Sequence, residues 1–93
     1  MADNIKIKGV EANVGINANR STFANSTIVR IVNTDASNHV LITLRDTSNT
    51  VLGSFTIGSS ATDFSGECLM KNPSDTIEAN TADIAKGAPI GFY

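Results

Sequence analysis

Three short apolar segments separated by two polar turns, between residues 27 and 57, constrain the fold of this chain more than any other feature. In the middle segment, 39–45, Val40, Ile42 and Leu44 fall on one face, and the other face carries His39, Leu41, Thr43 and Arg45, the period of a half-buried strand. Asp and Asn fill the intervening turns at 35–38 and 46–49, where such side chains bond nearby backbone. The pattern predicts three consecutive antiparallel strands, 27–33, 39–45 and 50–57, paired as a meander.

The composition favours strands over helices throughout the chain. Ile and Val total 16 residues and Leu only 4, and β-branched side chains suit a pleated sheet better than a helix. Ser, Thr and Asn total 29 residues, and their short polar side chains compete for helical backbone hydrogen bonds. Long helices are therefore not expected.

The C-terminal third predicts three further strands. The first covers 62–71, with a bend or bulge at Gly66, and Pro73 ends it because proline cannot donate to a ladder. The second is 75–79 and the last is 88–93. Phe64, Cys68 and Met70 share one face of the first strand, the second is built around Ile77, and the last carries Ile90, Phe92 and Tyr93.

The N-terminal segment, 1–26, has the weakest pattern. Ile5 and Ile7 alternate with Lys6 and Lys8, as in an edge strand, and this segment can pair with its own sheet or with a neighbouring copy. The chain as a whole, 1–93, is expected to form a single all-β domain. The predicted architecture is a small β-barrel or β-sandwich of about six to eight short antiparallel strands; a barrel of the Sm-like or SH3-like type is the specific alternative.

The charge and hydropathy of the chain disfavour two classes of partner, nucleic acids and membranes. The net charge is −2 and the seven basic residues are scattered, whereas nucleic-acid binding draws on clustered Lys and Arg. Binding to nucleic acid is thus not expected. No apolar stretch reaches the ~18–20 residues that cross a bilayer, and the first residues do not resemble a signal peptide. We expect no membrane association and a chain made in the cytoplasm.

No catalytic, metal or cofactor motif is complete. His39 is the single histidine and Cys68 the single cysteine, too few for a zinc site of three or four such ligands. His39 is expected to be exposed or packed at a turn, and Cys68 to be buried as a small hydrophobe. Asp35, Asp46 and Asp75 are expected to stabilise turns. We expect a protein that is not an enzyme and that needs no cofactor.

Because no catalytic or metal-binding motif is complete, we expect the protein to act by binding other copies of itself or other proteins through its surface. Arg30 lies inside an apolar strand, and it is expected either to face solvent at a sheet edge or to pair with a carboxylate across a subunit contact. Packing between copies would add to the modest core of so short a chain. The candidate interface residues are Ile5, Ile7, Arg30, Ile90, Phe92 and Tyr93.

Four phrases carry a resemblance to a known group of proteins: TIVRIVNTD at 27–35, NHVLITLRD at 38–46, VLGSFTIG at 51–58 and ECLMKNPSDTIEA at 67–79. Together they resemble small β-rich proteins of marine tailed bacteriophages, especially cyanophages. The resemblance covers residues 27–93. It implies a virion structural protein, such as a capsid decoration, head or tail protein, present as a homo-oligomer with other capsid or tail proteins as partners.

A second resemblance is architectural. Short bent strands after a variable N-terminal segment look like Sm-like barrels, which form rings that bind RNA. A ring-forming RNA-binding module, or a small carbohydrate-binding module, is therefore the alternative function. The RNA version requires Lys6, Lys8, Arg30 and Arg45 to gather in one cluster.

Overall fold

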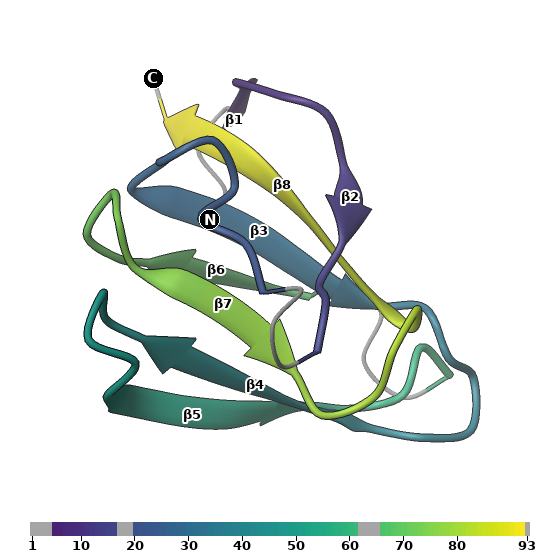
Figure 1. Cartoon of the computed structure of the whole chain (residues 1–93). Helices are drawn as coiled ribbons and strands as arrows, with labels where there is room; N and C mark the ends of the chain where they lie inside the picture. Colours follow the sequence, from purple (N-terminus) through teal and green to yellow (C-terminus); the bar gives the residue numbers. More distant parts are fainter. Residues whose placement is uncertain (1–4, 17–19, 62–65, 93) are drawn as a thin grey trace.

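The computed structural model describes residues 5–16, 20–61 and 66–92. It confirms an all-β fold of antiparallel strands in two sheets, with no helix among these residues. The sheets face each other as an open sandwich and do not close into a barrel (Figure 1). The strands are β1 (Ile5–Ile7), β2 (Ala12–Asn13), β3 (Ile28–Asn33), β4 (Val40–Arg45), β5 (Val51–Ile57), β6 (Glu67–Met70), β7 (Thr76–Ala79) and β8 (Ala85–Phe92).

One sheet has five strands and the other three. The five-stranded sheet runs in the order β1-β8-β3-β6, and β2 also pairs with β8, beyond the end of β1. The three-stranded sheet runs β5-β4-β7. Strands distant in the sequence thus become neighbours, since β8 lies between the N-terminal strands and β3.

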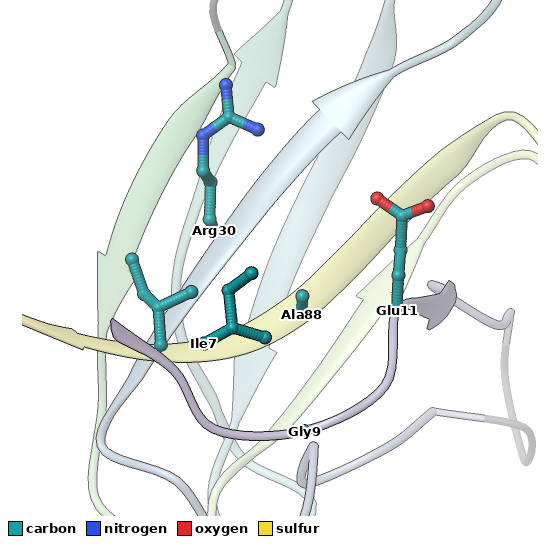
Figure 2. Close-up of a pocket in the computed structure, with 6 residues that line it drawn as sticks. Ile7, Gly9, Glu11, Arg30 and Ala88 are labelled. Carbon is teal, nitrogen blue, oxygen red and sulfur yellow. The ribbon is translucent and has the colours of Figure 1, made fainter. Parts of the chain in front are cut away.

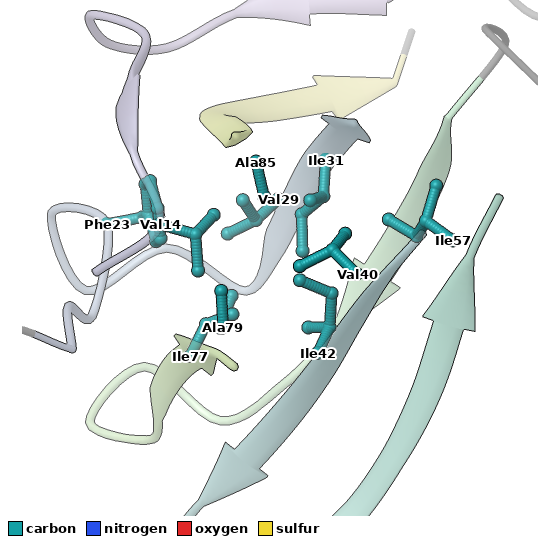
Figure 3. Close-up of a cluster of buried hydrophobic side chains, with 10 residues drawn as sticks. All are labelled: Val14, Phe23, Val29, Ile31, Val40, Ile42, Ile57, Ile77, Ala79 and Ala85. Atoms are coloured by element: carbon teal, nitrogen blue, oxygen red, sulfur yellow. The ribbon is translucent and has the colours of Figure 1, made fainter. Parts of the chain in front are cut away.

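The core fills the space between the two sheets, because alternate side chains of each strand point to one face. In β4, Val40 and Ile42 are almost completely buried while Leu41 between them is 38% exposed, as the alternation predicts. Figure 3 shows side chains of both sheets meeting in this layer. The buried cluster comprises Val14, Phe23, Val29, Ile31, Val40, Ile42, Ile57, Ile77, Ala79 and Ala85.

The turns are built as the sequence predicts. The Asp35 carboxylate accepts hydrogen bonds from the backbone N–H of Ser37 at 2.8 Å and of Asn38 at 3.1 Å. Asp46 Oδ1 does the same for Ser48 and Thr50, both at 2.9 Å. Asp75 Oδ2 accepts from the backbone N–H of Asn72 at 3.3 Å.

The predicted meander is wrong at its first connection. β4 and β5 form the expected hairpin, but β3 lies in the other sheet, between β8 and β6. The fully buried Asn33 holds the crossing: its Nδ2 donates to the carbonyls of Asn38 (2.7 Å) and Gly58 (3.2 Å), and its Oδ1 accepts from the Asp35 N–H (2.9 Å). A turn closed by an Asp side chain can join two strands of one hairpin or two strands of different sheets. The turn at 35–38 therefore does not determine whether β3 pairs with β4, and the predicted pairing was wrong.

Three local predictions need correction. The strand predicted over 62–71 is only β6, beginning after Gly66 (φ 72°), and Phe64 lies outside the described residues. Cys68 is exposed and not buried, because Leu69 next to it takes the face that packs on the core. The closing strand begins earlier than predicted, at Ala85.

The third segment of the predicted meander also departs from its pattern. The alternation in 50–57 places Val51, Phe55 and Ile57 inward, but Val51 is 51% exposed. The pairing of β4 with β5 shifts register between Leu44 and Arg45, so that Arg45 faces Val51. This irregularity turns the first residues of β5 away from the core.

The described part of the N-terminal segment pairs with the chain's own sheets. β1 and β2 are antiparallel to β8. The chain then crosses between the sheets: the Val14 N–H donates to Ala85 of β8 at 2.8 Å, and the Gly15 carbonyl accepts from Ala79 of β7 at 2.9 Å. Ser21 continues along β7 by bridging to Ile77.

Phe23 is a core residue that the sequence pattern did not indicate. It is 4% exposed and packs over Gly87, where an added Cβ would come within 2.9 Å of the ring. Phe23, Ala24 and Asn25 all have positive φ, between 51° and 59°. A tight left-handed turn of this kind has no hydrophobic periodicity, so the sequence of residues 20–26 predicted neither a strand nor a helix.

Candidate functional site

The outer face of the five-stranded sheet carries a row of four apolar side chains across four strands. Ile7 of β1 is paired with Ile90 of β8, and Ile28 of β3 with Met70 of β6. Continuing the β3–β8 register by one residue sets Ile28 opposite Ile90. We call Ile7, Ile90, Ile28 and Met70 the apolar row.

The two ends of the apolar row are the most exposed part of it. Ile7 is 73% and Met70 is 74% exposed, whereas Ile90 in the middle is 3% exposed. A face of a sheet that only contacts water normally carries polar side chains at these positions. Single exposed apolar side chains are common on proteins, but here two of them mark the ends of one row that crosses four strands.

A pocket opens beside the row because the edge of the sheet is interrupted at Pro89. The Pro89 carbonyl accepts a hydrogen bond from the Lys8 N–H at 2.9 Å. The nitrogen of Pro89 faces the same edge, but proline has no N–H and cannot donate the second hydrogen bond of the pair. The chain leaves the ladder there and rejoins it at Ala12. Gly9 permits the close passage, since a Cβ at that position would come within 2.6 Å of the proline ring.

The pocket has a volume of about 400 Å³ and is lined by Ile7, Gly9, Glu11, Arg30, Ala88 and Ile90. Ala88 contributes only a methyl group, and its neighbour across the ladder is Arg30. Figure 2 shows the carboxylate of Glu11 and the guanidinium of Arg30 projecting on the same side of the sheet, with Ile7 and Ala88 between them. The arrangement offers an apolar hollow with one positive and one negative group at its sides.

The structure brings together most of the residues predicted as an interface. Ile7, Arg30 and Ile90 line this one pocket, and the backbone register pairs Ile5 with Phe92 immediately beyond it. Tyr93 lies outside the described residues. The expectation that Arg30 occupies a sheet edge is wrong, because β3 has a strand on each side and Arg30 is half-buried.

Sequence reasoning missed the other members of this surface. Met70 was predicted to lie on the same strand face as Cys68, which was expected to be buried. Glu11, Gly9 and Ala88 were not among the predicted interface residues. The available signal was the proline inside an otherwise regular strand, which predicts an interruption of the neighbouring strand. Which of the two strands beside Pro89 is interrupted depends on the strand order, and the strand order cannot be derived directly from the sequence.

The remaining candidates do not gather into a second site. His39 is exposed at the turn before β4, as expected. No group of three or more potential metal-binding side chains occurs within the described ranges. Lys6 and Arg30 belong to the five-stranded sheet and Lys8 directly follows β1, but Arg45 belongs to the other sheet, where its guanidinium pairs with Glu78. The four basic residues that an RNA site requires are therefore split between two sheets.

One buried charged pair has a structural explanation. Lys71 is 8% and Asp75 is 5% exposed, in the turn that joins β6 to β7. Lys71 Nζ donates to the carbonyls of Asn72 at 3.2 Å and of Pro73 at 3.0 Å. Burial lowers the pKa of Lys71, and the nearby charge of Asp75 opposes that shift. The lysine thus closes the turn between the two strands.

Comparisons of the chain with protein-family models, with curated proteins and with solved structures found no match. In the part of the chain that the structure describes, no helix is long and apolar enough to cross a membrane.

Proposed function

We propose that this protein is a non-catalytic assembly subunit that binds other protein subunits through the apolar row and the pocket beside it. The observation that carries the proposal is the exposure of Ile7 and Met70 at the two ends of one continuous apolar row. Full burial of such a side chain contributes about 1.5–3 kcal/mol. Covering both ends would therefore offset part of the entropic cost of association.

The face is large enough to form the centre of a specific interface. Strands lie about 4.8 Å apart and rise about 3.3 Å per residue. Four strands and the eight residues of β8 therefore span roughly 15–20 Å by 25 Å. Stable interfaces bury about 800 Å² of accessible surface on each partner. The flat area of this face, roughly 375–500 Å², is about half of that value, so neighbouring surface would have to contribute the rest of the interface.

The pocket adds specificity to this face. Its apolar lining from Ile7, Ile90 and Ala88 accepts one apolar side chain of a partner. Arg30 and Glu11 beside it favour a partner that places polar groups of opposite charge near that side chain. A flat apolar strip alone would not distinguish between partners.

The assembly we propose is a virion. The resemblance to small β-rich phage proteins supports a capsid decoration, head or tail component, made in the host cytoplasm and then built into the particle. A subunit of this kind acts by positioning itself on other subunits, so the proposal requires no cofactor. Its partners are copies of itself and other capsid or tail proteins.

Three variants test the surface. Ile7→Glu and Met70→Glu place a charge at either end of the apolar row, and we expect each to raise the dissociation constant of the native complex at least tenfold, because the charge would be desolvated. Val10→Glu is the matched control, since Val10 is 87% exposed and does not line the pocket. Circular dichroism of each variant checks that the fold is retained.

The measurement is native mass spectrometry with sedimentation velocity, on protein purified without nuclease. A closed oligomer that Ile7→Glu dissociates and Val10→Glu preserves supports the assembly subunit. A monomer that also fails to bind phage particles contradicts it. Oligomers that carry RNA would instead favour the Sm-like RNA-binding function.

A further inference from the structure

The four outer edges of the two sheets are not equally protected against pairing with another strand. An exposed edge presents unpaired backbone groups, and proteins protect such edges with charge, with short strands or with covering segments. β7 is covered, because Ile77 exchanges hydrogen bonds with Ser21 (2.9 and 3.2 Å) and Ala79 donates to Gly15. β1 has three residues, one of them Lys6, and β6 has four, beginning with Glu67.

β5 has no charge, is not short and is not covered, and its one irregularity, the register shift between Leu44 and Arg45, affects only its first residues. It has seven residues, Val51–Ile57, with no charged residue and no proline. It is the terminal strand of its sheet, with β4 on one side and no described strand on the other (Figure 1). Val51 and Leu52 on this strand are each 51% exposed.

The hydrogen-bonding pattern shows which residues of β5 present their backbone to the open edge. The Leu41 carbonyl accepts from the Asn80 N–H at 3.1 Å, so Leu41 and Thr43 of β4 bond toward β7. By alternation, Val40 and Ile42 bond toward β5, where they are paired with Ile57 and Phe55. The backbone N–H and C=O groups of Ser54 and Thr56 therefore point away from β4.

We propose that β5 pairs with β5 of a second copy of this chain, antiparallel, so that two three-stranded sheets join into one. A two-fold contact brings the same edge from both copies together. Because β5 is uncharged over its whole length, the two strands meet without repulsion between like charges. Ser54 and Thr56 supply donors and acceptors on both sides, and the exposed apolar groups of Val51 and Leu52 gain cover.

This contact is independent of the apolar row, which lies on the other sheet. A chain with both contacts can extend beyond a dimer, whereas the two-fold β5 contact alone produces only a dimer. The two proposals can therefore fail separately.

Ser54→Pro tests the pairing with little change inside the subunit. The Ser54 N–H is not used by β4, so proline removes a donor only at the open edge and places its ring in the path of the second strand. Ser54→Ala is the matched control, because it keeps the N–H. We expect Ser54→Pro to raise the dissociation constant of the β5 contact at least tenfold in sedimentation velocity, and Ser54→Ala to leave it within twofold.

Amide hydrogen exchange gives a direct second readout on the unmodified chain. We expect the N–H groups of Ser54 and Thr56 to become protected as the protein concentration rises, while that of Phe55 is protected at all concentrations by β4. The Ile7→Glu variant should show the same behaviour. Fast exchange at Ser54 and Thr56 at concentrations where the protein is oligomeric would overturn the inference, and so would an oligomer that Ser54→Pro leaves unchanged.

Discussion

Replacing Asn33 tests whether one buried side chain holds the passage of the chain from one sheet to the other. Its amide makes three hydrogen bonds, to the carbonyls of Asn38 and Gly58 and from the N–H of Asp35. The side chain is completely buried, so water cannot replace these partners. The bonds tie the end of β3 to the loop before β4 and to the residue after β5.

The expected cost of Asn33→Ala follows from these three contacts. Each hydrogen bond of this kind contributes about 1 kcal/mol net, and a buried group left unpaired costs about 1–3 kcal/mol. We therefore expect the free energy of unfolding to fall by about 3 kcal/mol or more. For a domain of this size that is a decrease of roughly 12–24 °C in Tm.

Asn33→Asp makes the same test sensitive to pH. The new carboxylate would face two carbonyl oxygens, and its burial raises its pKa above the unfolded value of ~3.9. A raised pKa means that the folded state prefers the protonated form. Relative to the unmodified chain at the same pH, the variant should be least stable near pH 7 and should recover as the pH falls through its folded pKa toward 4.

Urea unfolding followed by circular dichroism measures both effects, with the slope m checked for constancy. Asn38→Ala is the control, because the exposed side chain of Asn38 only donates to Asp35 Oδ2 at 3.3 Å. We expect that variant to lose less than about 0.5 kcal/mol. A loss below about 1 kcal/mol for Asn33→Ala would refute the role of Asn33 in fixing the crossing.

Three further predictions concern the backbone and pH. Hydrogen bonds from the backbone N–H of Ser37, and then from the side chain and N–H of Asn38, lower the pKa of Asp35 below its ordinary value of 3.8. The stabilisation by Asp35 should therefore be present above pH 3.8 and be lost as the pH falls through the folded pKa. Comparing the unfolding free energies of Asp35→Ala and the unmodified chain between about pH 2 and 7 measures this loss. Ala24→Gly should stabilise the protein by about 0.5–1 kcal/mol, because exposed Ala24 has φ 59° and glycine relieves ~1–2 kcal/mol of strain there at a smaller entropic cost; a fall in Tm would contradict this. Gly66→Ala should destabilise by about 2 kcal/mol or more in urea unfolding, since φ is +72° and the new Cβ would collide with the Ile31 carbonyl; an unchanged midpoint would contradict it.

The candidate site was half predictable. Ile7 and Ile90 could be selected from the sequence because each lies in an alternating apolar segment near a chain end. Met70 and Glu11 could not, because their place on the surface depends on β6 pairing with β3 and on the interruption of the N-terminal strand at Pro89. Arg30 was noticed as a charge within an apolar strand, but its position inside the sheet is a consequence of strand order.

The sequence alone determined where most of the strands lie and which Asp side chains close their turns. Alternation placed Val40 and Ile42 inward and Leu41 outward, and the carboxylates of Asp35 and Asp46 bond the backbone two to four residues later, so both features are local. Strand pairing is not local. An alternating strand specifies which side chains are buried, but every strand presents the same backbone donors and acceptors to its neighbours. Only the tertiary structure decided that β3 joins β8 and β6, that Phe23 fills the core through a left-handed turn, and that Cys68 faces outward, because each of these follows from which faces and edges meet when the two sheets pack.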